Sequence, residues 1–138
     1  MVRTTMLAAV LCVSAASAQT NLYTYRGEYA YSSLGSTVVN AGDLDGDGIN
    51  DLFLGVPGET SLGTVRLLSG ATGALIYSVH STAVTGGFGL YVGRIGDVDF
   101  YGKPDFAVGD TAETGPSGAG SVHVFSGASG APIYTVYG

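Results

Sequence analysis

The stretch AGDLDGDGINDLFLG, residues 41–55, decides how this sequence folds. In a chain that is only 12% charged, it gathers four aspartates within nine positions: Asp43, Asp45, Asp47 and Asp51. Carboxylates this close repel one another unless water separates them or a cation lies among them. Gly46 and Gly48 allow the backbone to curl, so that the carboxylates can converge. The apolar run that follows has the composition of a β-strand.

Oxygen ligands of this kind select a hard cation, and a flexible loop with many oxygens favours Ca²⁺ over Mg²⁺. The backbone carbonyl of Ile49 would add a ligand at the seventh position of the loop. An EF-hand loop begins in the same way, but it needs an acidic residue at position twelve and a helix on each side. Leu54 stands at that position, within a strand-like run. The remaining alternative is a solvated Asp–Gly turn that binds nothing.

The sequence repeats itself. Residues 34–55, LGSTVVNAGDLDGDGINDLFLG, return 54 positions later as FGLYVGRIGDVDFYGKPDFAVG at 88–109. Residues 63–79, GTVRLLSGATGALIYSV, return 57 positions later as GSVHVFSGASGAPIYTV at 120–136. The change of offset places three extra residues in the second unit, near 113–118. Recurrence in register argues against a chance cluster of acids.

The second unit carries an altered copy of the aspartate loop. Asp97, Asp99 and Asp105 repeat the first, third and ninth positions of the loop. Tyr101 replaces the third carboxylate, and Lys103 adds a positive charge nearby. We expect three carboxylates to hold Ca²⁺ more weakly than four.

The hydrophobic pattern predicts an all-β fold. Period-two alternation in TVRLLS and SVHVFS indicates strands, and GATG and GASG indicate turns. Residues 22–25, LYTY, align with 76–79, IYSV, and predict one extra N-terminal strand. The other predicted strands, four in each unit, lie at about 36–41, 52–55, 64–69, 75–80, 90–95, 106–109, 121–126 and 132–137.

Residues 1–18 have the features of a secretory signal peptide: a basic start, an apolar run and a small-residue cleavage site. A short membrane anchor is the alternative, but the apolar run is too short to span a bilayer. Cys12, the only cysteine, lies in this segment, so residues 19–138 would hold neither thiol nor disulfide. We therefore expect a secreted domain that relies on another kind of staple and does not enter a membrane.

Acidity is concentrated in the two loops, which hold seven of the 11 acidic residues. Only four Lys and Arg follow position 18, so a basic nucleic-acid-binding face is absent from the sequence.

These motifs together resemble FG-GAP repeats, the blades of the integrin α-subunit N-terminal β-propeller. FGLYVG at 88–93 resembles the FG element, LGVPG at 54–58 resembles the GAP element, and the aspartate loops resemble the calcium loop of a blade. AVGD at 107–110 departs from the GAP pattern. The resemblance covers residues 22–138. It implies β-propeller blades: two complete four-stranded antiparallel blades and one extra N-terminal strand, as part of a larger or assembled propeller.

The domain boundaries follow from the repeats. Residues 22–33 would be the end of a blade, residues 34–87 one blade, and residues 88–138 another. The resemblance also implies structural Ca²⁺ in the loops, whose candidate ligand positions are Asp43, Asp45, Asp47, Ile49 (carbonyl), Asp51, Asp97, Asp99, Tyr101, Lys103 and Asp105.

The expected function is a non-catalytic, calcium-binding extracellular module for binding or adhesion, whose partner is a protein or glycan that the sequence does not identify. Self-assembly to complete a propeller is a further possibility. The alternatives are a non-catalytic part of an exported hydrolase and a purely structural fragment. Motifs of hydrolase centres are absent from the sequence, and His80 and His123 are predicted to be surface histidines.

Overall fold

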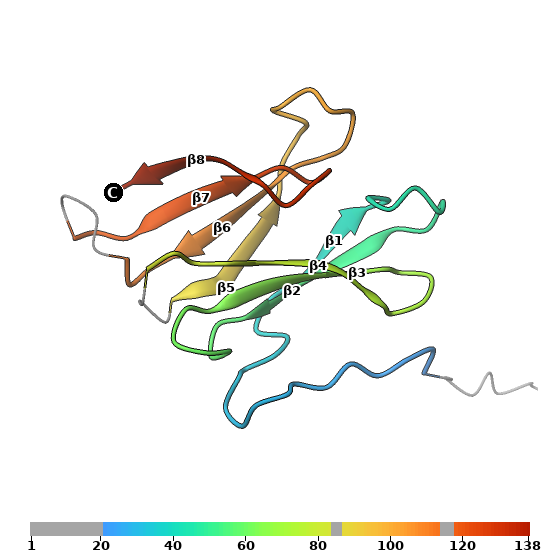
Figure 1. The fold of residues 1–138 in the computed structure, drawn as a ribbon, viewed down its shortest axis with the longest axis horizontal. Coiled ribbons are helices and arrows are strands. Elements are labelled where there is room, and N and C mark those ends of the chain that lie inside the picture. Colours follow the sequence, from blue (N-terminus) through green and yellow to red (C-terminus); the bar gives the residue numbers. More distant parts are fainter. Residues whose placement is uncertain (1–20, 84–86, 114–117) are drawn as a thin grey trace, which may run out of the picture.

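Two four-stranded antiparallel sheets make up the fold in the computed structural model, which describes residues 21–83, 87–113 and 118–138. Consecutive strands are neighbours in both sheets (Figure 1). The first sheet contains β1 (Val38–Gly42), β2 (Asp51–Val56), β3 (Thr64–Leu68) and β4 (Leu75–His80). The second contains β5 (Phe88–Arg94), β6 (Phe106–Asp110), β7 (Ser121–Phe125) and β8 (Pro132–Tyr137). The predicted pair of four-stranded blades is confirmed.

The two sheets repeat each other down to their irregularities. The β3–β4 ladder shifts register between Leu67 and Leu68, and the β7–β8 ladder shifts at the corresponding place. The turns between these strands both rely on a glycine in the left-handed region, Gly73 and Gly130, each with φ of 72°. A side chain would strain the backbone there, so the GATG and GASG motifs fix the hairpins.

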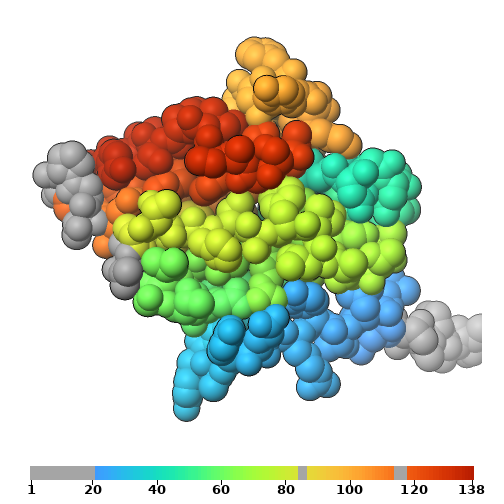
Figure 2. Space-filling view, viewed as in Figure 1, coloured from blue at the N-terminus to red at the C-terminus, as the bar shows by residue number. Residues whose placement is uncertain are grey.

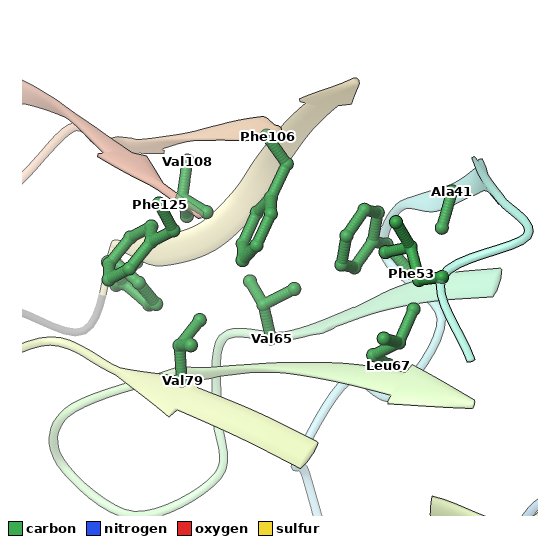
Figure 3. Packing of buried hydrophobic residues seen from close by; sticks show 10 residues of the cluster. Ala41, Phe53, Val65, Leu67, Val79, Phe106, Val108 and Phe125 are labelled. Carbon is green, nitrogen blue, oxygen red and sulfur yellow. The ribbon is translucent and has the colours of Figure 1, made fainter. Parts of the chain in front are cut away.

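The hydrophobic core lies between the sheets and is built from both of them (Figure 3). Phe53 of β2 meets Phe106 of β6 with ring centroids 4.3 Å apart, and Phe106 stacks on Phe125 at 5.3 Å. Val65 of β3 and Val79 of β4 complete the side contributed by the first sheet. Burial of this shared surface holds the two blades together.

Main chains also approach closely where the sheets meet. A Cβ atom at Gly89 would lie 2.6 Å from the carbonyl oxygen of Thr64, and one at Gly55 would overlap the carbonyl oxygen of Gly89. A Cβ at Gly63 would overlap the carbonyl of Phe88. The Phe–Gly pair at the start of β5 therefore fits into a seat formed by Gly55, Gly63 and Thr64 of the first sheet, in which the two glycines leave room for its main chain.

The extra strand predicted at residues 22–25 is not formed. These residues pair with neither of the two sheets, so they form no ladder. The segment nevertheless lies against the first sheet, and the Tyr23 hydroxyl donates to the Gly70 carbonyl at 3.4 Å. Tyr77 of β4 donates to Gly127 in the same way, at 3.0 Å. Residues 22–25 thus contact the first sheet as β4 contacts the second, which supports their alignment with 76–79.

The signal peptide predicted for residues 1–18 lies outside the described residues. In the part of the chain that the structure describes, no helix has the length and apolarity needed to cross a membrane.

Candidate metal loops

The first aspartate loop joins β1 to β2, and the second joins β5 to β6. Both loops extend beyond the same end of the two sheets (Figure 1). In the first loop, Asp43, Asp45 and Asp47 each place an oxygen within 4.8 Å of the others. Asp43 also accepts hydrogen bonds from the backbone of Gly46, at 2.6 Å, and of Gly48, at 3.0 Å. The glycines therefore curl the loop as the sequence predicts.

Asp51, the last aspartate of the first loop, has a different environment. Its side chain is fully buried. One oxygen accepts hydrogen bonds from Leu44 at 2.7 Å and Asp45 at 3.2 Å, and the other accepts one from Gly70 at 3.0 Å. Asp51 ties the loop to the turn between β3 and β4, and it does not belong to the group of converging oxygens. Ile49 is 51% exposed, and its backbone carbonyl stays a predicted ligand.

The second loop brings together Asp97, Asp99 and Asp105, with one oxygen of each within 4.8 Å of the others. Asp105 is fully buried and repeats the bonding of Asp51. It accepts hydrogen bonds from Val98 at 2.7 Å, Asp99 at 3.3 Å and Gly127 at 2.9 Å. The two loops are therefore built on the same buried carboxylate.

One oxygen of Asp97 indicates that the second loop suits a cation. Asp97 Oδ1 is shielded from solvent and has no hydrogen-bond partner. A shielded carboxylate oxygen without a partner is energetically costly, and a hard cation among three carboxylates would remove that cost. A hydrogen bond from the Ser126 side chain lowers the pKa of the Asp99 carboxyl, which favours the charged form that a cation requires. The residues of the second loop therefore fit Ca²⁺.

The side chains of the two remaining candidate ligands of the second loop, Tyr101 and Lys103, do not join its carboxylates. Tyr101 is 77% exposed at the tip of the loop. Lys103 reaches across to the first loop, where its ammonium donates a hydrogen bond to the Asp43 carbonyl at 2.8 Å. The positive charge expected beside the second loop therefore lies at the first loop. Only the backbone carbonyls of Tyr101 and Lys103 remain as groups that could face a cation in their own loop.

A buried acid paired with a basic side chain also recurs in both blades, and the sequence reasoning missed it. In the first blade Arg66 donates two hydrogen bonds to Glu59, and both side chains are buried. Burial opposes the charge of Arg66, but Glu59 and Tyr25 outweigh it, so the pKa of the guanidinium is raised. In the second blade His123 and Glu113 take these positions, with Nε2 and Oε2 2.7 Å apart.

The prediction of a surface position for His123 is therefore wrong. Its side chain is 12% exposed, because it fills the position that Arg66 holds in the first blade. A signal was present in the sequence: Glu59 and Glu113 align at the offset of 54 that relates the aspartate loops. His80, in contrast, is exposed as predicted.

The surroundings of His123 resemble a catalytic triad in composition but not in geometry. Ser121 Oγ lies 2.9 Å from His123 Nε2, and the Glu113 carboxylate contacts the same nitrogen. Thr135 Oγ1 lies 3.0 Å from the other ring nitrogen, His123 Nδ1. A triad needs the serine and the acid on opposite nitrogens, so that the ring can pass a proton between them. This arrangement is better suited to packing than to nucleophilic catalysis.

Asp110, Glu113 and His123 also place one oxygen or nitrogen each within 4.8 Å. The corresponding position to His123 in the first blade is Arg66, which cannot ligate a metal. The feature shared by the blades is thus a buried acid–base pair.

Comparison with known proteins gives a consistent result. Residues 34–68 match the sequence model of the FG-GAP repeat. Integrin alpha-PS2 of Drosophila melanogaster is 34% identical over 125 residues, covering 78% of this chain and 8% of the relative. Integrin alpha-5 of Xenopus laevis is 35% identical over 94 residues, covering 60% and 9%. Integrin alpha-V of Gallus gallus is 32% identical over 111 residues, covering 72% and 10%. The chain spans a tenth or less of the length of these relatives.

Paired four-stranded sheets with aspartate loops at one end define a class: blades of the β-propeller type. Within that class the chain belongs to the FG-GAP repeat proteins and is similar to integrin α chains.

Proposed function

We propose that the chain is a non-catalytic, calcium-stabilised module of an extracellular binding or adhesion protein. The observation that carries the proposal is the shielded, unpartnered Oδ1 of Asp97 among the carboxylates of the second loop. Similarity to integrin α chains supports an adhesion-type role. The signal peptide predicted for residues 1–18 supports an extracellular location.

Calcium would act on binding through the shape of the second loop. Asp97, Asp99 and Asp105 would hold the ion, and the ion would neutralise their mutual repulsion. The tip of the same loop presents two aromatic side chains to solvent, Phe100 at 90% exposure and Tyr101 at 77%. Aromatic side chains are common anchors in interfaces. An ordered loop would present them to a protein or glycan partner with less loss of conformational entropy.

The ion also links binding to stability. Ca²⁺ that binds only the folded state stabilises it by mass action, and extracellular modules typically bind with dissociation constants on the order of 10⁻⁴–10⁻³ M. Addition of millimolar Ca²⁺ to the protein should therefore raise the melting temperature, and excess EDTA should lower it again. Mg²⁺ should have a smaller effect, because the many-oxygen loop does not impose an octahedral geometry.

The decisive comparison uses three proteins: the wild type, Asp97→Asn and Glu28→Gln. Each substitution removes one acidic charge, but the Glu28 side chain is 63% exposed and lies outside both loops. Asp97→Asn should lose most of the Ca²⁺-dependent rise in melting temperature that the second loop contributes, and Glu28→Gln should keep it. Calorimetric titration would check the binding directly. A wild-type melting curve that is indifferent to both EDTA and Ca²⁺ would refute the calcium claim.

A further inference from the structure

The outer face of the second sheet carries valines whose counterparts in the first sheet are buried. Val65 and Val79 are 1% and 7% exposed, because the second sheet covers them. Their repeat counterparts, Val122 and Val136, are 43% and 55% exposed. Valines that are covered in the first sheet are thus exposed at the equivalent positions of the second sheet. We call this face of the second sheet the open face.

Glycines show the same difference between the two blades. A Cβ at Gly55 would overlap the Gly89 carbonyl across the sheet interface, whereas one at its counterpart Gly109 would meet only Tyr91, in its own blade, at 3.4 Å. The FG-type glycines differ in the same way. A Cβ at Gly89 would lie 2.6 Å from the Thr64 carbonyl oxygen, whereas one at its counterpart Gly35 would meet nothing within 4 Å. The seat on the first sheet is thus filled by Phe88 and Gly89, and the equivalent seat on the second sheet is empty.

The empty seat is a cavity of about 410 Å³ on the open face. Its lining includes Gly109, Gly120, Ser121, Val122 and Val136. Four of these positions correspond to Gly55, Gly63, Thr64 and Val65. The first three contact the Phe88–Gly89 pair in the filled seat, and Val65 belongs to the same buried cluster as Phe88. The shape that fits the cavity is therefore the start of another blade, with a large apolar residue followed by glycine.

Each chain also carries such a blade start, on its opposite side. Leu34 and Gly35 are the repeat counterparts of Phe88 and Gly89, and Gly35 has φ of 82° where Gly89 has 87°. Val38, the counterpart of Val92, is 59% exposed beside them. The N-terminal segment lies on this side of the molecule, and the second sheet lies on the other (Figure 2).

Residues 22–26 occupy the place that β8 of an incoming copy would need. They contact the first sheet through Tyr23, which bonds Gly70 at 3.4 Å, and Tyr25, which bonds Arg66 at 2.8 Å. No strand ladder holds them, and Leu22 is 89% exposed. The segment is therefore a weak substitute for a β4-type strand.

We propose that copies of this chain associate head to tail: the open face of one copy receives Leu34–Gly35 of the next, and β8 displaces residues 22–26 there. The contact is heterologous, so each pair retains one open face and one blade start. Association should therefore continue beyond the dimer as the concentration rises. The N-terminal segment opposes it by competing with β8.

Sedimentation velocity of the full chain over a concentration series tests this inference, with Ca²⁺ present throughout. Val136→Asp places a charge at the centre of the proposed contact, and we expect it to weaken association by at least about tenfold. Ile133→Asp is the matched control, because Ile133 lies in the same strand and is 36% exposed but does not line the cavity. Circular dichroism and melting curves would verify that both variants fold.

A third variant, Tyr23→Ala, separates this contact from other forms of association. It loosens the competing segment, so head-to-tail association should begin at a lower concentration than in the wild type. A monomer at every soluble concentration would overturn the inference and leave the open face for a different blade. So would a dimer that does not grow, or association that Val136→Asp leaves unchanged. None of these results bears on calcium binding, so the two proposals fail separately.

Discussion

The carbonyl oxygen of Gly89 in β5 occupies the space in which a side chain on Gly55 of β2 would begin. This backbone contact explains why one unit needs a glycine in its GAP-like element and the next needs one in its FG element. The two motifs are the two halves of a single joint between neighbouring blades.

The joint gives a paired prediction. Gly55→Ala should lower the free energy of unfolding by about 3 kcal/mol or more, because the sheets must separate to admit a methyl group. Gly109→Ala, at the equivalent position of the second blade, should change it by less than about 1 kcal/mol, because its nearest neighbour, Tyr91, is 3.4 Å away. Urea denaturation at low protein concentration would measure both. Equal effects at the two positions would contradict the proposed role of the joint.

The buried carboxylate of Asp51 should contribute to stability even without calcium. Asp51→Ala removes the acceptor of three backbone hydrogen bonds, and we expect a loss of about 3–5 kcal/mol in the presence of EDTA. Asp45→Ala removes an exposed carboxylate that accepts one such bond, from Asp47, and should cost less than about 1 kcal/mol under the same conditions. Chemical denaturation with chelator present distinguishes structural carboxylates from carboxylates that serve only as ligands.

Tyr77 should make the fold sensitive to alkali. Burial, together with the negative charges of Asp105 and Asp51, raises the pKa of its hydroxyl well above the ordinary value. The folded state then resists ionisation that the unfolded state undergoes from about pH 10. The contribution of Tyr77 is therefore fully present below that pH and declines as the pH rises further. Tyr77→Phe should flatten this decline at a cost of about 1 kcal/mol at neutral pH.

Tyr134 is the control for this measurement. It is the repeat counterpart of Tyr77 and is 50% exposed. Tyr134→Phe should leave the alkaline part of the stability profile unchanged. A profile that neither substitution alters would contradict the assignment to Tyr77.

Lys103 should link the two loops. Its ammonium bonds the Asp43 carbonyl and places a positive charge beside the first loop. Lys103→Met should lower the melting temperature in EDTA, because the carboxylates of that loop lose a compensating charge. The same variant should gain more stability from added Ca²⁺ than the wild type does, because the ion no longer meets a like charge. Lys103→Arg should behave as the wild type, and an identical calcium response in all three proteins would refute the link.

Most of the fold was predictable from the sequence, because strands and turns are encoded locally. The strand predicted at 132–137 matches β8, and that at 75–80 matches β4. The strand at 22–25 failed for a reason that no local pattern contains. Its composition suits a strand, but a strand also needs a ladder partner, and residues 22–25 pair with neither sheet.

The candidate site was predictable in part. Spacing located both aspartate loops, since convergence depends on the glycines within them. Spacing did not distinguish Asp51, which anchors the loop from a buried position, from the three less buried aspartates beside it. The contact between Lys103 and Asp43 joins residues 60 positions apart, so it depends on how the sheets pack.

The shared cluster between the sheets has a consequence for how the molecule comes apart. Phe53 and Val79 belong to the first sheet and are covered by the second sheet. Phe106 belongs to the second sheet and is covered by the first. Neither sheet possesses an apolar interior of its own, so neither can melt while its neighbour persists. Heating should therefore produce one cooperative transition, and amide exchange in β2 and β6 should report the same opening energy.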